Sequence, residues 1–434
     1  MSALNKTEEM VLKNMEDHRF VSPELEKAFC EGGLCEFRKF VINHNKEVGV
    51  EKKLAVLLRG NDNRIIIYQN NHKIWDLSLN NNECKVSFNF DHARYTQDWD
   101  KKLDELCKLD DGLGFVLPNH RTAEMLPDKL PIKIVRNKNG MVTGGSIGVI
   151  SCTKPKFSKD FVEGSYNIIH ELQKDFFKDQ STDYFRQEVK VEYPEVEDVS
   201  GAGGNVFVEK RWQQRLLFHF DDMKDGLYAY DLEFSQKYPD SEFVKKYAKK
   251  NGQEYASVKA KEIKQKLGGN EPDILAIRYE NWEPKALVFI EVKSTKTACE
   301  SKSSGVKSHM EGMSKYSKEP ILMKKRRIDA YKSLLQYKSM GLINKSIDIK
   351  SIPDNLPIEN VLLFTNAKVS EKGKEKPNSL DYFKNNWKDI EKLSQKDKKN
   401  ICEVWITKSN YWDETISIDM KPFEHIDKVL ESLE

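Results

Sequence analysis

Two acidic residues and a lysine lie at the ends of two neighbouring apolar segments, and their types could do chemistry. Asp273 precedes the apolar run 274–277, and Glu291 and Lys293 end the apolar run that begins at Leu287. A strand built from such residues belongs in a core, where an unpartnered charge costs several kcal/mol. We therefore expect these three charged side chains to have partners or a metal ion.

The geometry of a β-strand predicts that these charges meet. Side chains alternate along a strand, so Glu291 and Lys293 share a face with Phe289. Residues 280–285, between the two apolar runs, have turn character. If the strands pair as a hairpin, Asp273 falls opposite Glu291, within about one residue. Two carboxylates and one ammonium group would then converge on one spot.

A divalent metal ion is the natural partner for such a group. Two carboxylates about 4 to 5 Å apart repel each other, and a hard cation with oxygen ligands relieves the repulsion. We expect Asp273 and Glu291 to bind Mg2+, or Mn2+, as the cofactor. Lys293 could orient or activate a water, while the ion polarises a phosphate oxygen and lowers the pKa of that water. This chemistry suits hydrolysis of a phosphodiester bond.

The pattern resembles that of the PD-(D/E)xK nuclease superfamily, which has the restriction-endonuclease-like fold. Asp273 matches the first Asp of the motif, Glu291 its second acid and Lys293 its lysine. The resemblance covers residues 272–293, with a Pro-Asp opening one apolar run and a Glu-x-Lys closing the next. It implies a Mg2+-dependent endonuclease, with DNA as the expected partner and restriction or anti-phage defence as the expected role.

The elements around the motif agree with that superfamily, whose core runs helix, three strands, helix, strand. We predict an α/β chain, α+β overall, with a mixed sheet flanked by helices. The apolar residues Ile328, Tyr331 and Leu335 share one face of the predicted long helix. A helical insertion at about 238–268 departs from the minimal core. The predicted elements are strands at 227–234, 359–365 and 403–407, and the long helix at 324–340.

The superfamily usually adds one more acid from the helix before the first strand. Glu209 is the candidate here if the residues around it are helical. Apolar residues alternate over 216–220, however, so a hairpin with the strand at 227–234 is also open. In that case the predicted helix at 159–177 becomes the core helix. The competing acids are Glu163, Glu171 and Glu233.

Positive charge gathers after the Glu-x-Lys strand. Between residues 293 and 327, ten Lys and Arg face three acids, a local balance of +7, whereas the whole chain carries +2. A polyanion must lie beside the metal for its phosphate to react, although 324–327 could also be a plain solvated helix start. Residues 303–309 predict a turn into a short helix with a serine as N-cap. The candidate nucleic-acid contacts are His309, Lys324, Lys325, Arg326 and Arg327.

A separate α+β domain with a small antiparallel sheet is predicted over residues 1–150, followed by the nuclease domain over 155–434. Hairpin-type links join several predicted strands. This domain could recognise nucleic acid, bind a partner protein or a second copy of the chain, or serve as a scaffold. The predicted elements are helices ending near residue 29 and covering 36–45, and strands at 53–58, 64–69, 72–77 and 84–90.

Composition limits the remaining possibilities. The seven cysteines are scattered without a CxxC pair, so the sequence supports neither a disulfide scaffold nor a zinc site. No apolar run of 18 residues occurs, and we expect a cytoplasmic protein without a membrane. Two alternatives to a DNA nuclease stay open: a non-catalytic nucleic-acid-binding or scaffold subunit of a larger defence assembly, and an RNA or tRNA endonuclease.

Overall fold

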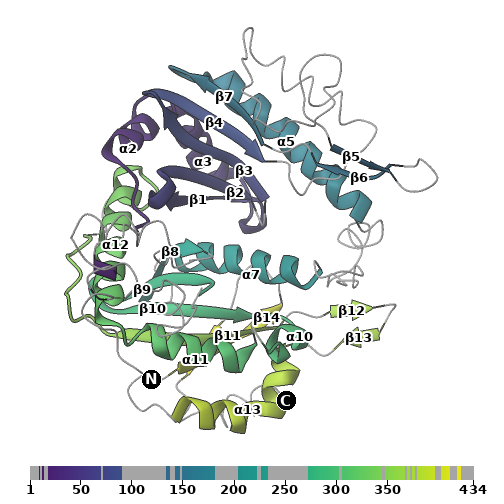
Figure 1. Cartoon of the computed structure of the whole chain (residues 1–434), viewed down its shortest axis with the longest axis vertical. Coiled ribbons are helices and arrows are strands. Elements are labelled where there is room, and N and C mark those ends of the chain that lie inside the picture. The colour runs from purple at the N-terminus through teal and green to yellow at the C-terminus, as the bar shows by residue number, and fades with distance from the viewer. Residues whose placement is uncertain are drawn as a thin grey trace, which may run out of the picture. The chain divides into compact units, whose positions relative to one another are not determined.

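The chain divides into two units in the computed structural model, and each unit contains its own sheet (Figure 1). The N-terminal unit consists of Phe20–Gly201 and Gln336–Asn344. The C-terminal unit consists of Met1–Arg19, Ala202–Leu335 and Lys345–Glu434. The structure describes residues 9, 12–13, 18–69, 72–89, 133–136, 142–146, 149–180, 204–221, 226–232, 272–302, 305–344, 348–366, 369–371, 374–376, 379–395, 402–410 and 418–421.

The N-terminal unit is built on a five-stranded antiparallel sheet of order β1-β2-β3-β4-β7. The four strands predicted in this region are confirmed, and β7 was not predicted. Asn81 and Asn82 link β3 to β4 with φ of 49° and 67°, a left-handed conformation that asparagine tolerates in tight hairpins. The strands are β1 (Leu54–Arg59), β2 (Arg64–Gln69), β3 (His72–Asn80), β4 (Glu83–Asn89) and β7 (Val149–Lys154).

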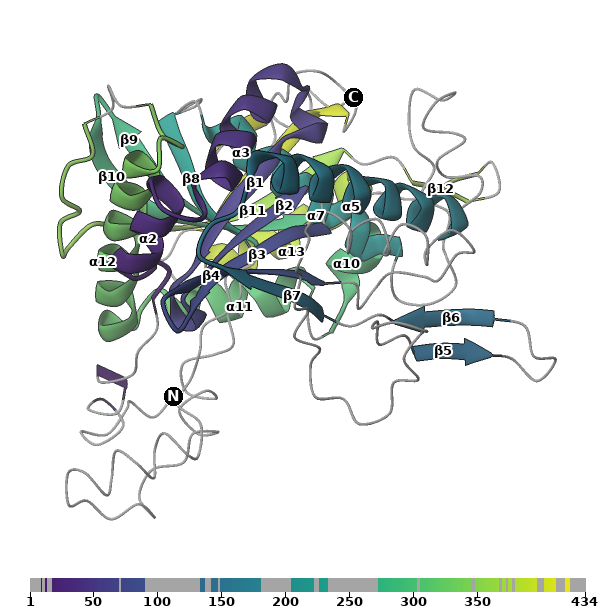
Figure 2. The ribbon, with the colours of Figure 1, turned by 90° about the horizontal axis from the view of Figure 1, so that it is seen from above.

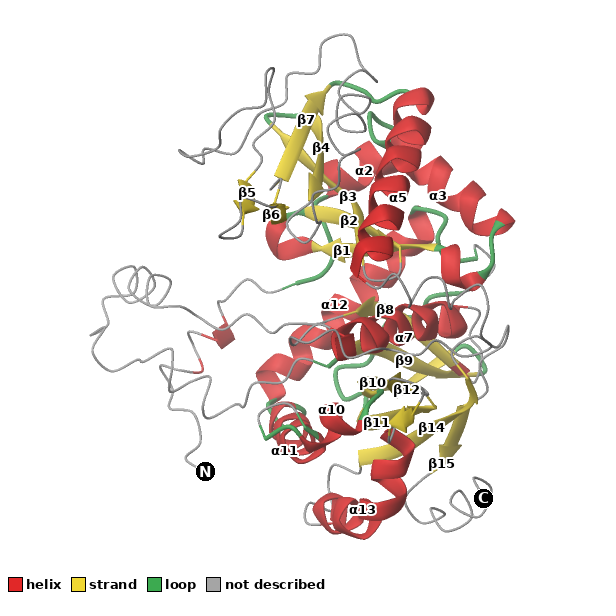
Figure 3. Ribbon diagram, turned by 90° about the vertical axis from the view of Figure 1, so that its right-hand side faces the viewer, coloured by secondary structure: helices red, strands yellow, loops and turns green. Residues whose placement is uncertain are grey.

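Helices α2 (Pro23–Cys30), α3 (Cys35–Glu47) and α5 (Lys159–Gln180) belong to this unit, and α3 and α5 lie on one face of its sheet (Figure 3). The side chain of Ser22 caps α2 by accepting from the Leu25 N–H. Trp75 Nε1 of β3 donates to Ser165 Oγ of α5 over 3.1 Å. The contact assigns α5 to this unit, so the predicted domain boundary at residues 150–155 is wrong.

The C-terminal unit holds a six-stranded mixed sheet of order β15-β14-β11-β10-β9-β8. The pairs β10–β11 and β11–β14 are parallel, and the other neighbours are antiparallel. The strands predicted from the sequence in this unit are confirmed, with ends that differ by a few residues. They are β8 (Leu227–Leu232), β9 (Ile274–Glu280), β10 (Glu283–Lys293), β11 (Ile358–Asn366) and β14 (Cys402–Asn410), and β15 (Ile418–Lys421) was not predicted.

Helices cover both faces of this sheet, as Figures 1 and 3 show. Phe220 of α7 lies against Trp405 of β14, with ring centroids 6.3 Å apart. Trp405 pairs in register with Leu363, whereas Leu362 and its partner Val404 point to the opposite face. The helices of this unit are α7 (Gly204–Asp221), α10 (Lys296–Glu300), α11 (Val306–Tyr316), α12 (Pro320–Ser339) and α13 (Ser379–Gln395). The residues of α12 from Gln336 onward belong to the N-terminal unit.

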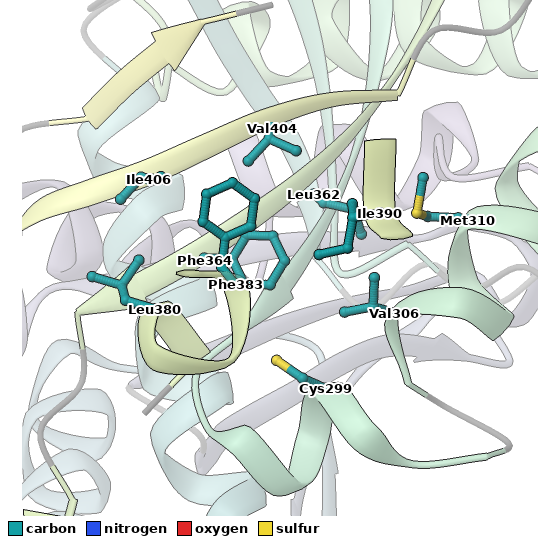
Figure 4. Close-up of a cluster of buried hydrophobic side chains, with 10 residues drawn as sticks. All are labelled: Cys299, Val306, Met310, Leu362, Phe364, Leu380, Phe383, Ile390, Val404 and Ile406. Atoms are coloured by element: carbon teal, nitrogen blue, oxygen red, sulfur yellow. The ribbon is translucent and has the colours of Figure 1, made fainter. Parts of the chain in front are cut away.

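A buried apolar cluster joins α10, α11 and α13 to β11 and β14 (Figure 4). Phe364 and Phe383 lie at its centre, with ring centroids 4.9 Å apart. Both rings are fully buried, and burying such a side chain contributes about 1.5 to 3 kcal/mol. The cluster holds these helices firmly against one face of the sheet. Its other buried members are Cys299, Val306, Met310, Leu362, Leu380, Ile390, Val404 and Ile406.

The orientation of α12 differs from the one predicted. Ile328 and Leu335 are 42% and 40% exposed, although the sequence pattern placed them on the buried face. The buried side of the helix carries Leu334 together with the charged residues Arg326 and Asp329. Because these charges neutralise each other in the interior, an apolar periodicity alone could not identify the inward face.

Shorter elements complete the described fold. Strands β5 (Lys133–Arg136) and β6 (Val142–Ser146) form an antiparallel pair, seen as opposed arrows in Figure 2. A second pair comprises β12 (Val369–Glu371) and β13 (Lys374–Lys376), and short 3-10 helices cover Val50–Lys52 and Gly60–Asp62. The predicted insertion at 238–268 lies outside the described residues. None of the described helices is long and apolar enough to cross a membrane.

Candidate active site

The hairpin of β9 and β10 sets Asp273 beside Glu291. Its antiparallel register pairs Ile274 with Ile290, and the next step along the two chains sets Asp273 against Glu291. Asp273 Oδ2 also accepts a hydrogen bond of 2.7 Å from the backbone N–H of Val292. The predicted opposition of the two acidic residues agrees with this register.

The second carboxylate oxygen of Asp273 is held by a residue that the sequence analysis missed. Gln213 of α7, which is 3% exposed, donates from Nε2 to Asp273 Oδ1 over 2.7 Å. Buried polar groups nearly always have such partners, and this bond fixes the orientation of the carboxylate. One feature of the sequence could have indicated Gln213: it lies one helical turn after the candidate Glu209, so the two positions share a face of the helix.

Glu291 and Lys293 form a buried ion pair at the end of β10. Lys293 Nζ lies 2.6 Å from Glu291 Oε1, and the two residues are 2% and 1% exposed. They share the sheet face of their register partners Leu362 and Phe364, the face that α10, α11 and α13 cover. Taking two charges out of water is costly, and their close contact offsets part of the cost. The predicted common face of the two side chains is confirmed.

His309 of α11 reaches the same carboxylate from the helix layer. Its Nδ1 lies 2.8 Å from Glu291 Oε2, and its side chain is 19% exposed. Neither of these two atoms makes a hydrogen bond within the described part of the chain. Glu291 is therefore approached from two sides, by an ammonium group and by an imidazole ring.

Helix α11 begins at Val306 after Gly305, so the predicted serine N-cap is wrong. A side chain at Gly305 would come within 2.2 Å of the Ser301 carbonyl oxygen. This close backbone approach explains why glycine stands here. The predicted short helix itself is confirmed, and it carries His309 in its first turn.

The candidate Glu209 lies on α7, four residues before Gln213, and its side chain is not described. The helical conformation of this segment is confirmed, and the alternative hairpin over 216–220 is wrong. Glu163 lies on α5 of the other unit and pairs there with Lys159 over 3.3 Å. The side chain of Glu171, also on α5, and the whole of Glu233 lie outside the described part.

Two of the four basic residues at 324–327 have structural partners instead of a free surface. Arg326 is fully buried and pairs with Asp329 over 2.9 Å, so its prediction as a nucleic-acid contact is wrong. Arg327 donates twice to the Leu356 carbonyl oxygen, over 2.6 and 3.0 Å. Burial lowers the pKa of Arg327, although the negative charge of the nearby Asp354 acts in the opposite direction.

The two lysines of this segment stay closer to solvent. The side chain of Lys324 is 61% exposed and lies 3.4 Å from Asp354, and Lys325 is partly buried. An exposed ion pair of this kind contributes little to stability. Lys324 therefore remains available as a surface cation, whereas the predicted cluster of four does not form one surface.

The partners of Arg326 form a buried charged network within the C-terminal unit. Arg19 pairs with Asp231 over 2.7 Å, and its backbone N–H donates to Asp329. The hydroxyl of Tyr230 is buried among these groups, and desolvation, with the nearby charge of Asp329, raises its pKa well above the ordinary value. The network joins the first segment of the unit to β8 and α12.

The residues at the end of β10 could hold a hard divalent cation. Mg2+ commonly uses one or two protein carboxylates and keeps water or phosphate oxygens as its other ligands. Asp273 and Glu291 supply two carboxylates, and Glu291 Oε2 is a buried oxygen without a hydrogen-bond donor in the described chain. Among the described residues no group of three or more His, Cys, Asp and Glu forms a larger metal site. Two protein carboxylates fit an ion such as Mg2+ that takes its other ligands from water or phosphate.

Comparisons with protein-family models, with curated proteins and with solved structures find no match for this chain. The assignment of an activity therefore depends on the geometry of the site. That geometry consists of the Glu291 carboxylate with a buried ammonium group and an imidazole beside it, and of the Asp273 carboxylate bonded to the Val292 N–H on the same hairpin.

Proposed function

We propose that the chain is a metal-dependent endonuclease of the PD-(D/E)xK type, which hydrolyses phosphodiester bonds of DNA. The observation that carries the proposal is the buried pair of Glu291 and Lys293 at the end of β10, with Asp273 bonded to the backbone N–H of Val292 between them in sequence. Paired carboxylates beside a buried ammonium group suit metal-assisted attack of water on a phosphate.

The order of elements supports the same proposal. Helix α7 is followed by β8, β9 and β10, then by helices α10 to α12, and then by β11, which lies parallel to β10. This is the succession of helix, three strands, helix and strand that the resemblance implies for a restriction-endonuclease-like core. The two acids stand at the adjoining ends of β9 and β10.

Each residue of the site has a distinct part in the proposed mechanism. A divalent ion, when bound at Asp273 and Glu291, would supply Lewis acidity toward a phosphate oxygen and an activated water. Gln213 and the Val292 N–H hold the Asp273 carboxylate in one orientation. Lys293 would orient the attacking water or stabilise negative charge developing on the phosphate, since its ammonium group is already fixed next to Glu291.

The biological setting that we propose is restriction or antiviral defence in the cytoplasm. This step rests on the resemblance alone, because many nucleases of that superfamily serve this purpose. Lys324, with its exposed side chain, is a candidate for phosphate contact outside the metal site.

The decisive experiment incubates the purified protein with plasmid, linear duplex DNA, single-stranded DNA and RNA, each with Mg2+, Mn2+ or EDTA. We expect cleavage of DNA that EDTA abolishes and that the Glu311→Gln variant, changed at an exposed carboxylate of α11, retains. Cleavage of RNA alone would indicate an RNA endonuclease. Binding of nucleic acid without cleavage under any of these conditions would support a non-catalytic subunit and overturn the proposal.

A further inference from the structure

We infer that the tip of the β9–β10 hairpin, residues 280–285, is a docking surface for the same tip of a second copy of the chain. The inference does not depend on the proposed nuclease activity, and it concerns the end of the hairpin away from Asp273 and Glu291. From the tip, β10 runs for 11 residues to Lys293, which places the two ends of the hairpin roughly 30 Å apart. Self-association at the tip therefore leaves the composition of the candidate active site unchanged.

The first observation is an exposed indole at the tip. Trp282 is 49% exposed, the largest fraction among the large apolar side chains of the described chain. No hydrogen bond or ring contact to another described residue holds its indole. Tryptophan buries about 150 to 250 Å2 where it is covered, and it is enriched at the energetic centres of protein interfaces. The side chain has the character of an anchor for a partner.

The second observation is backbone strain at the same residue. Trp282 has a φ of 66°, in the left-handed region that disfavours a residue with a Cβ atom. A type I′ turn prefers glycine at this position. Strained residues of this kind cluster where the side chain serves a function. Because the uncovered indole does little to offset the strain within one chain, a contact with another molecule accounts for its presence.

The charges around the indole indicate which molecule that is. Glu280 and Glu283 lie opposite each other in the register of the hairpin. Lys285 lies 3.7 Å from Glu280, and Lys350, in the loop before β11, pairs with Glu283. The tip therefore presents two acids and two lysines, all of them exposed. A polyanion such as DNA would meet as much repulsion as attraction on this surface.

A second copy of the chain satisfies this charge pattern. In a two-fold interface the same patch meets itself, so every group has to find its complement on an identical surface. When two tips meet head to head, the acids of one copy can face the lysines of the other. The two indoles then lie between them in stacked or edge-to-face contact. Balanced charges around an apolar centre are what such a contact requires.

The size of the tip limits the strength of the contact. Stable interfaces bury about 800 Å2 on each partner, several times the area of one indole. The neighbouring loop at 348–357, which carries Lys350, adds further surface, since most of its residues are exposed. We therefore expect weak, concentration-dependent self-association and not an obligate dimer.

Analytical ultracentrifugation of the full-length protein at about 1 to 100 µM tests the inference, because a small interface dissociates in this range. The wild-type chain should shift from monomer to dimer, and Trp282→Gly should weaken the dimer by at least about thirtyfold, as expected for an interface anchor. Glycine suits the left-handed turn, and circular dichroism checks that the fold is kept. Leu335→Ala, which removes an exposed apolar side chain from α12, should dimerise like the wild type.

Exchange of charges tests whether the partner is a second copy. One variant combines Glu280→Lys with Glu283→Lys, and the other combines Lys285→Glu with Lys350→Glu. Each variant alone should stay monomeric, because like charges then face each other across the two-fold axis. An equimolar mixture of the two should form a dimer again, since opposite charges meet. A mixture that stays monomeric would exclude the head-to-head arrangement.

The remaining outcomes are equally clear. A wild-type chain that is monomeric at every concentration, or a dimer that persists in Trp282→Gly, would overturn the inference. A monomeric wild type whose affinity for DNA falls in Trp282→Gly would mean that the indole stacks on bases instead. None of these results bears on the nuclease proposal, which the cleavage assay tests by itself. If Trp282→Gly fails to fold, Trp282→Asn provides the comparison, since asparagine also tolerates the left-handed conformation.

Discussion

At the scale of residues, the buried pair of Glu291 and Lys293 carries a large free-energy cost of desolvation. Both groups are almost completely withdrawn from water. Buried ion pairs seldom add net stability, yet removing one partner leaves the other charge uncompensated and is strongly destabilising. A pair of this kind at the end of an otherwise apolar strand is therefore better explained by chemistry than by stability, and substitutions that test it should preserve shape.

Asp273→Asn should abolish cleavage and leave the fold intact, and Glu291→Gln should abolish cleavage and also lower stability, because it leaves the buried Lys293 charge without its partner. Each replacement keeps the volume of the side chain, removes one anionic metal ligand and relieves repulsion between the carboxylates. Cleavage of plasmid DNA and far-ultraviolet circular dichroism measure the two effects. Full activity in either variant would exclude that residue from the catalytic site.

Lys293→Met should lower turnover by about a hundredfold or more while metal binding persists. The thioether chain fills the same space, and the change removes the ammonium group that would act on the water or the developing charge. Single-turnover cleavage rates, compared with Mn2+ affinity from calorimetry, separate the two effects. An unchanged rate with unchanged affinity would reduce Lys293 to an ion-pair partner of Glu291.

The residues of the site were predictable to different degrees. Asp273, Glu291 and Lys293 stood out because charges interrupt apolar runs at strand ends. Gln213 carries no charge and lies among other polar residues of a helix, so only the folded chain shows that it holds Asp273. Arg326 was misassigned because a buried arginine and an exposed one look alike in sequence.

At the scale of elements, the β9–β10 hairpin does most to position the site. Its turn residues Asn281 and Trp282 have φ of 53° and 66°, a pair of left-handed conformations typical of a type I′ turn. This turn matches the twist of the strands and fixes the register that sets Asp273 against Glu291. Asparagine suits its position, whereas tryptophan does not.

Trp282→Gly should raise the free energy of unfolding by about 0.5 to 1 kcal/mol and leave cleavage unchanged. Glycine adopts the left-handed conformation without the steric cost that a tryptophan bears there, and the side chain is 49% exposed. Urea unfolding of the variant measures the gain. Lys285→Ala, elsewhere on the same hairpin, should stay within about 0.5 kcal/mol of wild type. A loss of stability in Trp282→Gly would mean that the tryptophan makes contacts worth more than the strain.

Strands were more predictable than the orientation of helices. Strand residues alternate or form short apolar runs, and these patterns predicted β8, β9, β10, β11 and β14. The inward face of α12 was not predictable, because its buried side contains Arg326 and Asp329 while Ile328 faces outward. Arg326 and Asp329 neutralise each other within the helix, and the Arg19 backbone N–H, 310 residues away from Asp329, donates to that carboxylate.

At the scale of the whole molecule, the buried network of Arg19, Asp231, Arg326 and Asp329 joins segments that are about 300 residues apart. Each charge has a close opposite partner, and all four residues are at most 7% exposed. Such a network stabilises the unit only while it is whole, since any single deletion leaves a buried charge behind.

Arg326→Met should destabilise the protein by about 3 to 5 kcal/mol, because Asp329 would remain as an uncompensated buried charge. Thermal unfolding measures the loss. Combining Arg326→Met with Asp329→Asn should recover part of it, since the amide oxygen can still accept from the Arg19 N–H. Lys324→Met, two residues away and exposed, should have little effect. Equal stability of Arg326→Met and wild type would contradict a structural role for the network.

The boundary between the units was the least predictable feature. The pattern of α5 indicates an amphipathic helix, yet it does not say which sheet the helix covers. Hydrogen bonds such as that from Trp75 to Ser165 decide the matter, and they join residues about 90 positions apart. The prediction of a small antiparallel sheet near the N-terminus was correct because its hairpins are local.

Neither unit is a continuous stretch of chain, and this has a consequence for the order of synthesis. The N-terminal unit needs residues 336–344, where the Gln336 side chain exchanges hydrogen bonds of 2.8 Å with both backbone groups of Val21. The ribosome must therefore pass residue 336 before the N-terminal unit has all its residues. An expression fragment cut near residue 150 or 201 would lack them, so dissection of the protein calls for single-chain variants instead of separate halves.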